Sequence, residues 1–145
     1  MDRRALLQSL PAVALLPAAV WAGAQPEPAR AAVSATTVYE LREYHANEGK
    51  LDDLLKRFRE HTMRLFEKHG MKNVAYWTPL DDPLRGRTLI YILAHPSREE
   101  AASNWKAFVD DPEWQKVRDA SEANGKLVEK VDSTFMALTD FSPAL

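Results

Sequence analysis

The order of hydrophobic periods along the chain constrains its fold more than any other feature. Residues 36–44 alternate between two faces as a strand does, and residues 51–69 place apolar side chains at helical spacing. Residues 71–95 hold two apolar runs separated by the turn sequence DDPLRG, a second helical pattern covers 97–124, and a last strand pattern covers 130–141. This order predicts a ferredoxin-like βαββαβ fold of the α+β class, a four-stranded antiparallel sheet with both helices on one face.

The second helical pattern carries two start sequences. Ser97 and Glu100 form an S-x-x-E capping box, and Asp111 precedes a proline that suits the first position of a helix. We therefore expect a helix that breaks and restarts. Trp105 and Trp114 follow its apolar stripe, which favours a core role, with ligand contact as the alternative.

The sheet face that the helices leave free is expected to be apolar. We assign Tyr39 and Leu41 to the helix face, which leaves six apolar or aromatic residues as candidates for the uncovered face: Val38, Tyr44, Tyr91, Leu93, Met136 and Leu138. So much apolar surface predicts a covering partner. We expect a homodimer through the open sheet face, in which two sheets enclose a cavity as a dimeric α/β barrel.

The first 24 residues have the layout of a secretory signal peptide. A short basic start precedes an uncharged run from Ala5 to Pro26, with small residues at 22–24 as a cleavage site. A membrane anchor is the alternative, but Pro11 and Pro17 in the weakly apolar run argue against it. We expect a signal peptide over 1–24, a Pro/Ala linker over 25–35 and a folded domain over 36–145, with no stable membrane anchor after cleavage.

Arg3 and Arg4 resemble the paired arginines of the twin-arginine export motif, with Gln8 where lysine is usual. This predicts a bacterial protein that is periplasmic or secreted. The two arginines could instead be an ordinary basic start. A second A-x-A sequence at 29–31 leaves the cleavage position open.

Composition excludes several classes of function. The 145 residues include no cysteine, which excludes disulfides, thiolate metal sites and a cysteine nucleophile. The formal net charge of -2 lacks the basic surface of a nucleic-acid binder. The sequence also lacks H-E-x-x-H, a glycine-rich phosphate loop and G-x-S-x-G. We assign no metal and no cofactor.

The candidate binding residues begin on the first strand. Glu40, Arg42 and Tyr44 share a face by their spacing of two, and we expect that face to line the barrel and bind a polar or anionic small molecule through Arg42. Tyr91 and His95 join them if the matching face of the third strand points the same way. The alternative is an ion pair of Glu40 with Arg42 that only satisfies itself, within one subunit or across the dimer.

Two further residues are candidates for chemistry. His95 is the best acid or base because imidazole titrates near neutral pH and the residue stands at a strand end, although a loop histidine without a role is the alternative. Trp77 completes the ligand-binding set. Its indole could also serve an enzyme together with His95 and Asn73.

Four segments together resemble the NIPSNAP family: VYELREY, GKLDDLLKRF, KHGMKNVAYW and DDPEWQKV. The resemblance covers about Val38 to Thr139 and implies a dimeric ferredoxin-like α/β barrel. It implies little chemistry, because the family's molecular activity is poorly defined. The chain departs from the family at Leu93, where a tryptophan is common.

Three functions from different classes follow. The first is an exported dimer that binds a small organic molecule in its barrel without transforming it. The second is a cofactor-free or haem-using monooxygenase, suggested by fold analogy alone. The third is a protein-interaction module that docks a partner on acidic helix faces, such as those of Asp52, Asp53 and Glu60.

Overall fold

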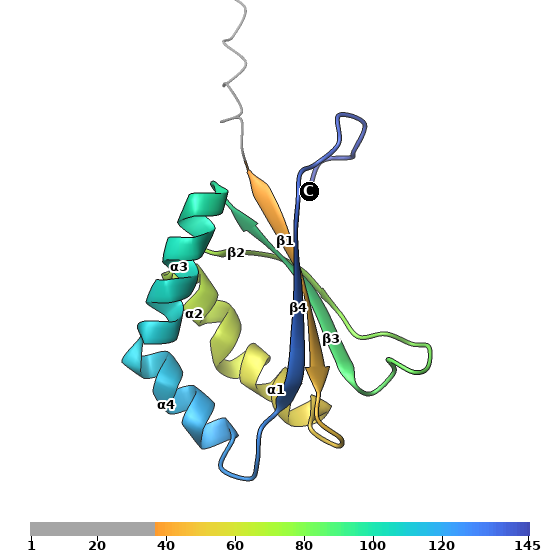
Figure 1. Ribbon diagram of the computed structural model, residues 1–145, viewed down its shortest axis with the longest axis vertical. Helices are drawn as coiled ribbons and strands as arrows, with labels where there is room; N and C mark the ends of the chain where they lie inside the picture. The colour runs from red at the N-terminus through yellow and green to blue at the C-terminus, as the bar shows by residue number, and fades with distance from the viewer. Residues whose placement is uncertain (1–36) are drawn as a thin grey trace, which may run out of the picture. The chain divides into compact units, whose positions relative to one another are not determined.

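Strand β1 (Val38–Ala46) lies in the interior of the sheet in the computed structural model, which describes residues 37–145. It is followed by helix α1 (Leu51–Arg57), π-helix η1 (Phe58–Thr62), helix α2 (Met63–Lys68), strands β2 (Lys72–Trp77) and β3 (Thr88–His95), helices α3 (Arg98–Asp110) and α4 (Pro112–Ser121), and strand β4 (Val128–Met136). The strand order is β2-β3-β1-β4 with antiparallel pairs, and Figure 1 shows all helices on one side. The predicted ferredoxin-like fold is confirmed. The predicted signal peptide and linker, residues 1–35, lie outside the described residues.

The first predicted helix forms over its whole length, with a π-helical turn in the middle. Its apolar stripe is buried as expected, at Leu54, Phe58 and Phe66 among others. The helix ends at Gly70, whose backbone adopts φ 76°. There the amide of Met71 donates to the carbonyl of Phe66 at 2.9 Å, a closing bond that a left-handed glycine permits.

The predicted break between the last two helices is also present. Ser97 Oγ accepts a hydrogen bond from the amide of Glu100 at 3.1 Å and begins α3. Asp111 ends α3 and begins α4, where its side chain accepts from the amide of Glu113 at 2.8 Å. Trp114 then packs on Phe108 with ring centres 4.5 Å apart, so its predicted core role is confirmed.

The prediction of which β1 face the helices cover is wrong. The ring of Tyr44 lies 5.7 Å from that of Phe58 in η1, and the ring of Tyr91 stacks at 5.9 Å on Phe66 in α2. Strand register places Glu40 and Arg42 on this same face. Val38, Tyr44, Tyr91 and Leu93 therefore face the helices instead of the open side. A period of two shows which residues share a face but not which face is covered.

The open face carries the opposite set of side chains. Register places there Tyr39 and Leu41 of β1, Ile90 and Ile92 of β3, and Met136 of β4. Trp77 and Leu138 are 49% and 44% exposed. Met136 is thus on the side predicted for it, and Leu138 lines a recess beside it. Glu43, Thr134 and Asp132 share this face by register, so it is apolar only in part. Of the helices in residues 37–145, none has the length and hydrophobicity to cross a membrane.

Candidate functional site

A cluster of polar side chains between the sheet and α3 is centred on the carboxylate of Glu40. Glu40 is 1% exposed. Its Oε1 accepts hydrogen bonds from Arg42 Nη1 and Ser133 Oγ, both at 2.7 Å, and its Oε2 accepts from Trp105 Nε1 at 2.7 Å and lies 3.0 Å from His95 Nε2. Three strands and one helix thus converge on one buried acid.

These partners determine the charge of Glu40. Burial alone would raise the pKa of the carboxyl, but the hydrogen bonds from His95, Trp105, Ser133 and Arg42 outweigh it and lower the pKa to about 2. Because an ionised carboxylate only accepts hydrogen bonds, His95 Nε2 must carry the proton between the two groups. Glu40 is therefore a stable anion with all its bonding capacity used.

Arg42 is the cation of the cluster, and its surroundings hold it in one orientation. Its guanidinium carbon lies 4.1 Å from the ring centre of Trp105 and 5.4 Å from that of Tyr44. The ion pair with Glu40 that the alternative interpretation predicts is present, and it leaves Glu40 with no free bonding capacity. Arg42 keeps spare capacity, because Nε has no hydrogen-bond partner in the described part of the chain and Nη2 reaches only the hydroxyl of Tyr44, at 3.5 Å.

His95 is less accessible than its place at a strand end predicts. The residue is 1% exposed and its ring lies 6.2 Å from that of Phe135. Nε2 is engaged with Glu40, while Nδ1 is buried without a partner among residues 37–145. The prediction of easy access is wrong, because the side chain points under α3 instead of out of the strand end.

Unpartnered polar atoms concentrate in this cluster. Of the four buried side-chain polar atoms that lack a hydrogen bond in the described residues, three belong to it: Arg42 Nε, Tyr91 Oη and His95 Nδ1. Burial also raises the pKa of Tyr91 well above its usual value, which keeps the phenol neutral. Buried polar groups without a partner cost free energy, so each one needs an explanation such as a bound molecule.

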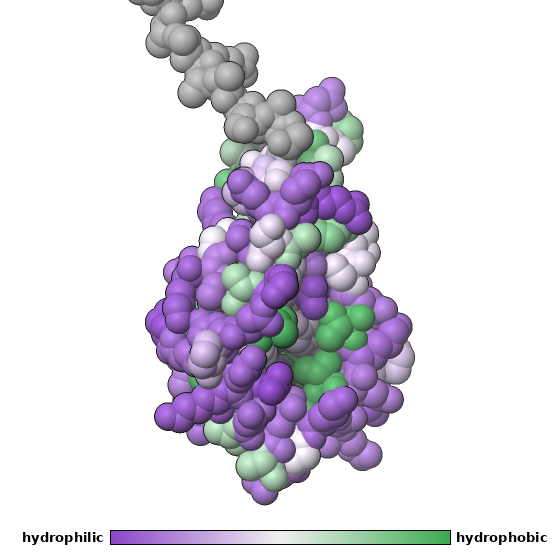
Figure 2. Space-filling view, turned by 60° about the vertical axis from the view of Figure 1, so that its left-hand side comes forward, coloured by the Kyte–Doolittle hydropathy of each residue, from purple (hydrophilic) through white to green (hydrophobic). Residues whose placement is uncertain are grey.

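The helices leave one side of this cluster open, along the helix-facing side of β4. Register puts Val131, Ser133 and Phe135 on the same face as Arg42, yet Val131 is 41% exposed and the side chain of Arg42 is 16% exposed. Figure 2, a view turned toward the helices, shows a hollow bordered by hydrophobic side chains. The side chain of Arg42 is therefore partly accessible to solvent.

The structure brings together five of the six predicted binding residues: Glu40, Arg42, Tyr44, Tyr91 and His95. It places Trp77 on the opposite face, so Trp77 and His95 cannot act together within one subunit. Asn73 is committed to the carbonyl of Met63 at 3.0 Å. Among residues 37–145, no group of three histidine or acidic side chains could hold a metal ion.

Sequence reasoning missed Trp105 and Ser133 as members of the site. Ser133 lies beside Arg42 only through the pairing of β1 with β4, which no local pattern reveals. The apolar stripe predicts a core role for Trp105, with ligand contact as the alternative, and its indole N–H makes it part of the cluster. A buried tryptophan needs an acceptor for its N–H, and an acid on the adjoining strand could have suggested one.

Comparison with protein families gives one result. The family model described as NIPSNAP matches residues 39–143, which is most of the chain. A comparison with curated proteins finds no match.

Solved structures share the fold at low sequence identity. An uncharacterised NIPSNAP-like domain protein from Burkholderia xenovorans is 16% identical with a TM-score of 0.65, covering 75% of this chain and 90% of its own. A NIPSNAP family protein of unknown function from Agrobacterium tumefaciens is 21% identical with a TM-score of 0.64, covering 76% and 95%. SnoaB, a cofactor-independent oxygenase from Streptomyces nogalater, is 12% identical with a TM-score of 0.51, covering 76% and 100%.

Proposed function

We propose a ligand-binding function for this chain, which belongs to the NIPSNAP family. The ligand is a small organic molecule whose negatively charged or strongly polar group meets Arg42 on the helix side of the sheet. This revises the location expected from sequence, because the predicted binding residues do not face the cavity that two open sheet faces would enclose.

The state of Arg42 carries this proposal. Burial alone would lower the pKa of the guanidinium, but Tyr44, Tyr91 and Glu40 raise it, so the cation persists in a partly dry place. Its position between two aromatic rings is fixed before any ligand arrives, which reduces the entropy cost of binding. Its Nη2, which reaches only the hydroxyl of Tyr44 at 3.5 Å, has bonding capacity left for a polar occupant.

Native mass spectrometry tests the proposal on the full chain purified gently from the cells that produce it. We expect the wild-type protein to retain a small molecule and Arg42→Gln to lose it. Arg59→Gln is the matched control, because Arg59 is exposed on η1 and forms no ion pair in the described residues. Equal retention by Arg42→Gln and wild type would refute the assignment to Arg42.

A second candidate function is oxygen-dependent turnover without a cofactor. The likeness to SnoaB, described as a cofactor-independent oxygenase, favours it, as does a buried histidine in the same polar cluster as Arg42 whose Nδ1 has no partner among residues 37–145. An oxygen electrode with a naphthoquinol as substrate tests it. We would expect consumption by the wild-type protein and none by His95→Gln, whereas equal rates would exclude His95.

We also propose that two copies cover each other's open faces. The apolar residues Tyr39, Leu41 and Ile92 support this, as does a recess of about 250 Å³ at the end of the face, lined in part by Tyr39, Met136 and Leu138. Apolar area of this kind gains roughly 25 cal/mol per Å² when water is removed from it. The homodimer would then close the recess.

Export to the periplasm is a separate proposal that depends on residues 1–24. The paired arginines and the uncharged run support it. Cell fractionation of a host that produces the full chain tests it. We expect the shortened protein in the periplasm and, for Arg3→Lys with Arg4→Lys, the full-length chain in the cytoplasm; an unprocessed wild-type chain would contradict the proposal.

A further inference from the structure

A groove between α1 and η1 on one side and α4 on the other holds cations that the proposed function does not use. We propose that it is a second binding site, for a small organic carboxylate. The groove has a volume of about 620 Å³, in the range of small-molecule sites. Its cations are Lys56, Arg57 and Lys116, and its apolar wall includes Val117 and Ala120. The inference does not depend on ligand binding at Arg42.

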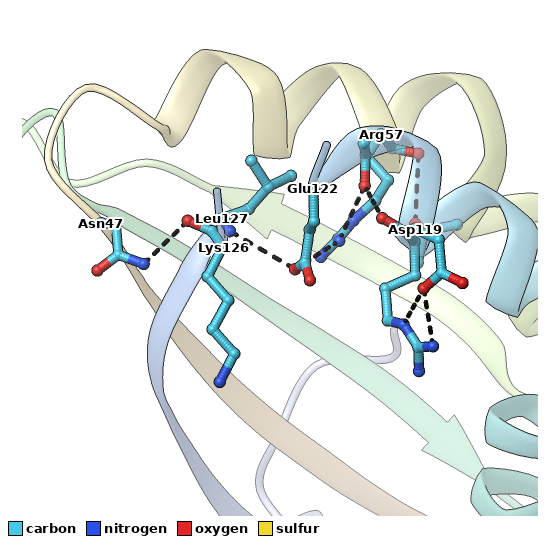
Figure 3. Close-up of polar contacts among 9 residues, drawn as sticks. Asn47, Arg57, Asp119, Glu122, Lys126 and Leu127 are labelled. Atoms are coloured by element: carbon cyan, nitrogen blue, oxygen red, sulfur yellow. Dashed lines mark hydrogen bonds and ion pairs between the residues drawn. The ribbon is translucent and has the colours of Figure 1, made fainter. Parts of the chain in front are cut away.

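Arg57 is the buried cation of this groove. It is 5% exposed, its Nη1 donates to Ser121 Oγ at 3.2 Å and to Glu122 Oε1 at 3.3 Å, and its guanidinium carbon lies 5.1 Å from the ring centre of Trp114. Figure 3 shows the same Glu122 oxygen also facing the backbone of Leu127, whose amide donates to it at 3.5 Å. Glu122, which accepts from Arg57, is therefore itself positioned by the backbone of Leu127, and together these contacts orient the guanidinium.

The guanidinium has bonding capacity left over. Its Nε is buried without a partner among the described residues, and its Nη2 makes no hydrogen bond there although water can reach it. Burial lowers the pKa of Arg57, and Glu122 only partly offsets this, so the cation is incompletely compensated. An oxygen of a bound anion at Nη2 would supply the missing charge-assisted hydrogen bond.

Of the three acids that line the groove, Glu113 is engaged in short ion pairs, whereas Asp53 and Glu60 make only long contacts within residues 37–145. Glu113 forms an ion pair with Arg64 and another with Lys68, at 3.1 Å in the second case. Asp53 lies 3.9 Å from Lys50, and Glu60 lies 3.9 Å from His61. Lys56 and Lys116 form no ion pair within residues 37–145. The charge that remains available to a ligand is positive.

This combination fits a carboxylate with a hydrocarbon body. One accessible guanidinium nitrogen, in a groove that two exposed ammonium groups also line, suits a single carboxylate. Because Nε is buried, the carboxylate would bond to Arg57 through Nη2. Val117 and Ala120 offer a short apolar surface beside it. Uncharged molecules of the same shape gain only the apolar contact.

Titration of the ¹⁵N-labelled full chain with octanoate, followed by NMR, tests the site. We expect saturable shifts in the amides of α1, η1 and α4, and much smaller shifts with octanol. The double variant Lys56→Gln with Lys116→Gln changes only exposed side chains and should weaken octanoate binding about tenfold. Lys72→Gln with Lys126→Gln removes the same charge from exposed positions outside the groove and should leave the affinity unchanged.

Three results would overturn the proposal. One is the lack of saturable shifts in this groove up to about 10 mM octanoate. Another is equal binding of octanol, and the last is equal weakening in both double variants. Arg42→Gln should leave these shifts unchanged, which separates the result from the ligand proposed at Arg42.

Discussion

Glu40 is the residue on which the polar cluster depends. Its carboxylate accepts hydrogen bonds from its own strand, from β3 and β4, and from α3. Each of these bonds stabilises the ionised form of the carboxyl group. A buried charge is tolerated here only because its partners surround it. The residue therefore couples the position of α3 to that of the sheet edge, and both of these frame Arg42.

This coupling predicts a pH dependence of stability. The folded-state pKa of Glu40, about 2, lies below the usual 4.5, so its stabilising contribution is fully present above pH 4.5 and is lost as the pH falls toward 2. Glu40→Gln should lower the free energy of unfolding by about 3 kcal/mol at pH 7, with a smaller difference from wild type below pH 4.5.

Urea unfolding of both proteins between pH 2 and 7 measures this difference. Glu48→Gln is the control, because Glu48 is exposed in a loop and makes no hydrogen bond in the described residues. If the difference in the free energy of unfolding between wild type and Glu40→Gln stayed constant over this pH range, the ionised carboxylate of Glu40 would not be the source of the stabilisation.

The side chains of β1 show where sequence reasoning reaches its limit at this scale. Spacing correctly grouped Glu40, Arg42 and Tyr44, because alternation is a property of any strand. It put the group on the wrong face, because Tyr39 and Leu41 were assigned to the helices and alternation alone does not show which face the helices cover. Trp105, His95 and Ser133 supply the hydrogen bonds that make burial possible, and they come from three separate segments.

At the scale of elements, the sequence predicted the secondary structure well because local chemistry determines it. Ser97, Asp111 and Gly70 each act on backbone atoms within a few residues of themselves. The π-helical turn was not predicted. Thr62 Oγ1 donates to the carbonyl of Arg57 at 3.3 Å within it, and no hydrophobic period distinguishes such a turn from an α-helix.

The end of α2 gives a prediction with a close internal control. Gly70 and Gly49 have similar backbone angles, φ 76° and 70°, but an added Cβ would lie 3.0 Å from Asn104 Nδ2 at Gly70 and within 4 Å of nothing at Gly49. Gly49→Ala should lower the free energy of unfolding by about 1 kcal/mol through backbone strain alone. Gly70→Ala should cost more, because Asn104 must also move.

Chemical unfolding of the two variants side by side measures the difference. Equal losses would mean that Asn104 moves away freely and that the contact between α3 and the end of α2 does not constrain the packing. A larger loss for Gly49→Ala would contradict the assignment of both glycines.

At the scale of the whole molecule, the proposed dimer depends on the open face. Ile92→Asp places a charge at the centre of that face and should convert the protein to a monomer that keeps its helical circular dichroism. Val109→Asp is the control, because Val109 is 48% exposed on α3 and should leave the dimer intact. Sedimentation velocity at micromolar concentration distinguishes these states. A monomeric wild-type protein would refute the proposed dimer.

The central claim is that the ligand binds on the helix side of the sheet. A crystal structure of the protein, produced from the full-length chain and purified from its own cells without refolding, tests this claim most directly. We predict electron density for a small molecule within hydrogen-bonding distance of the Arg42 guanidinium, under the edge of α3. Density for the molecule between two open sheet faces, with only protein and water around Arg42, would contradict the account.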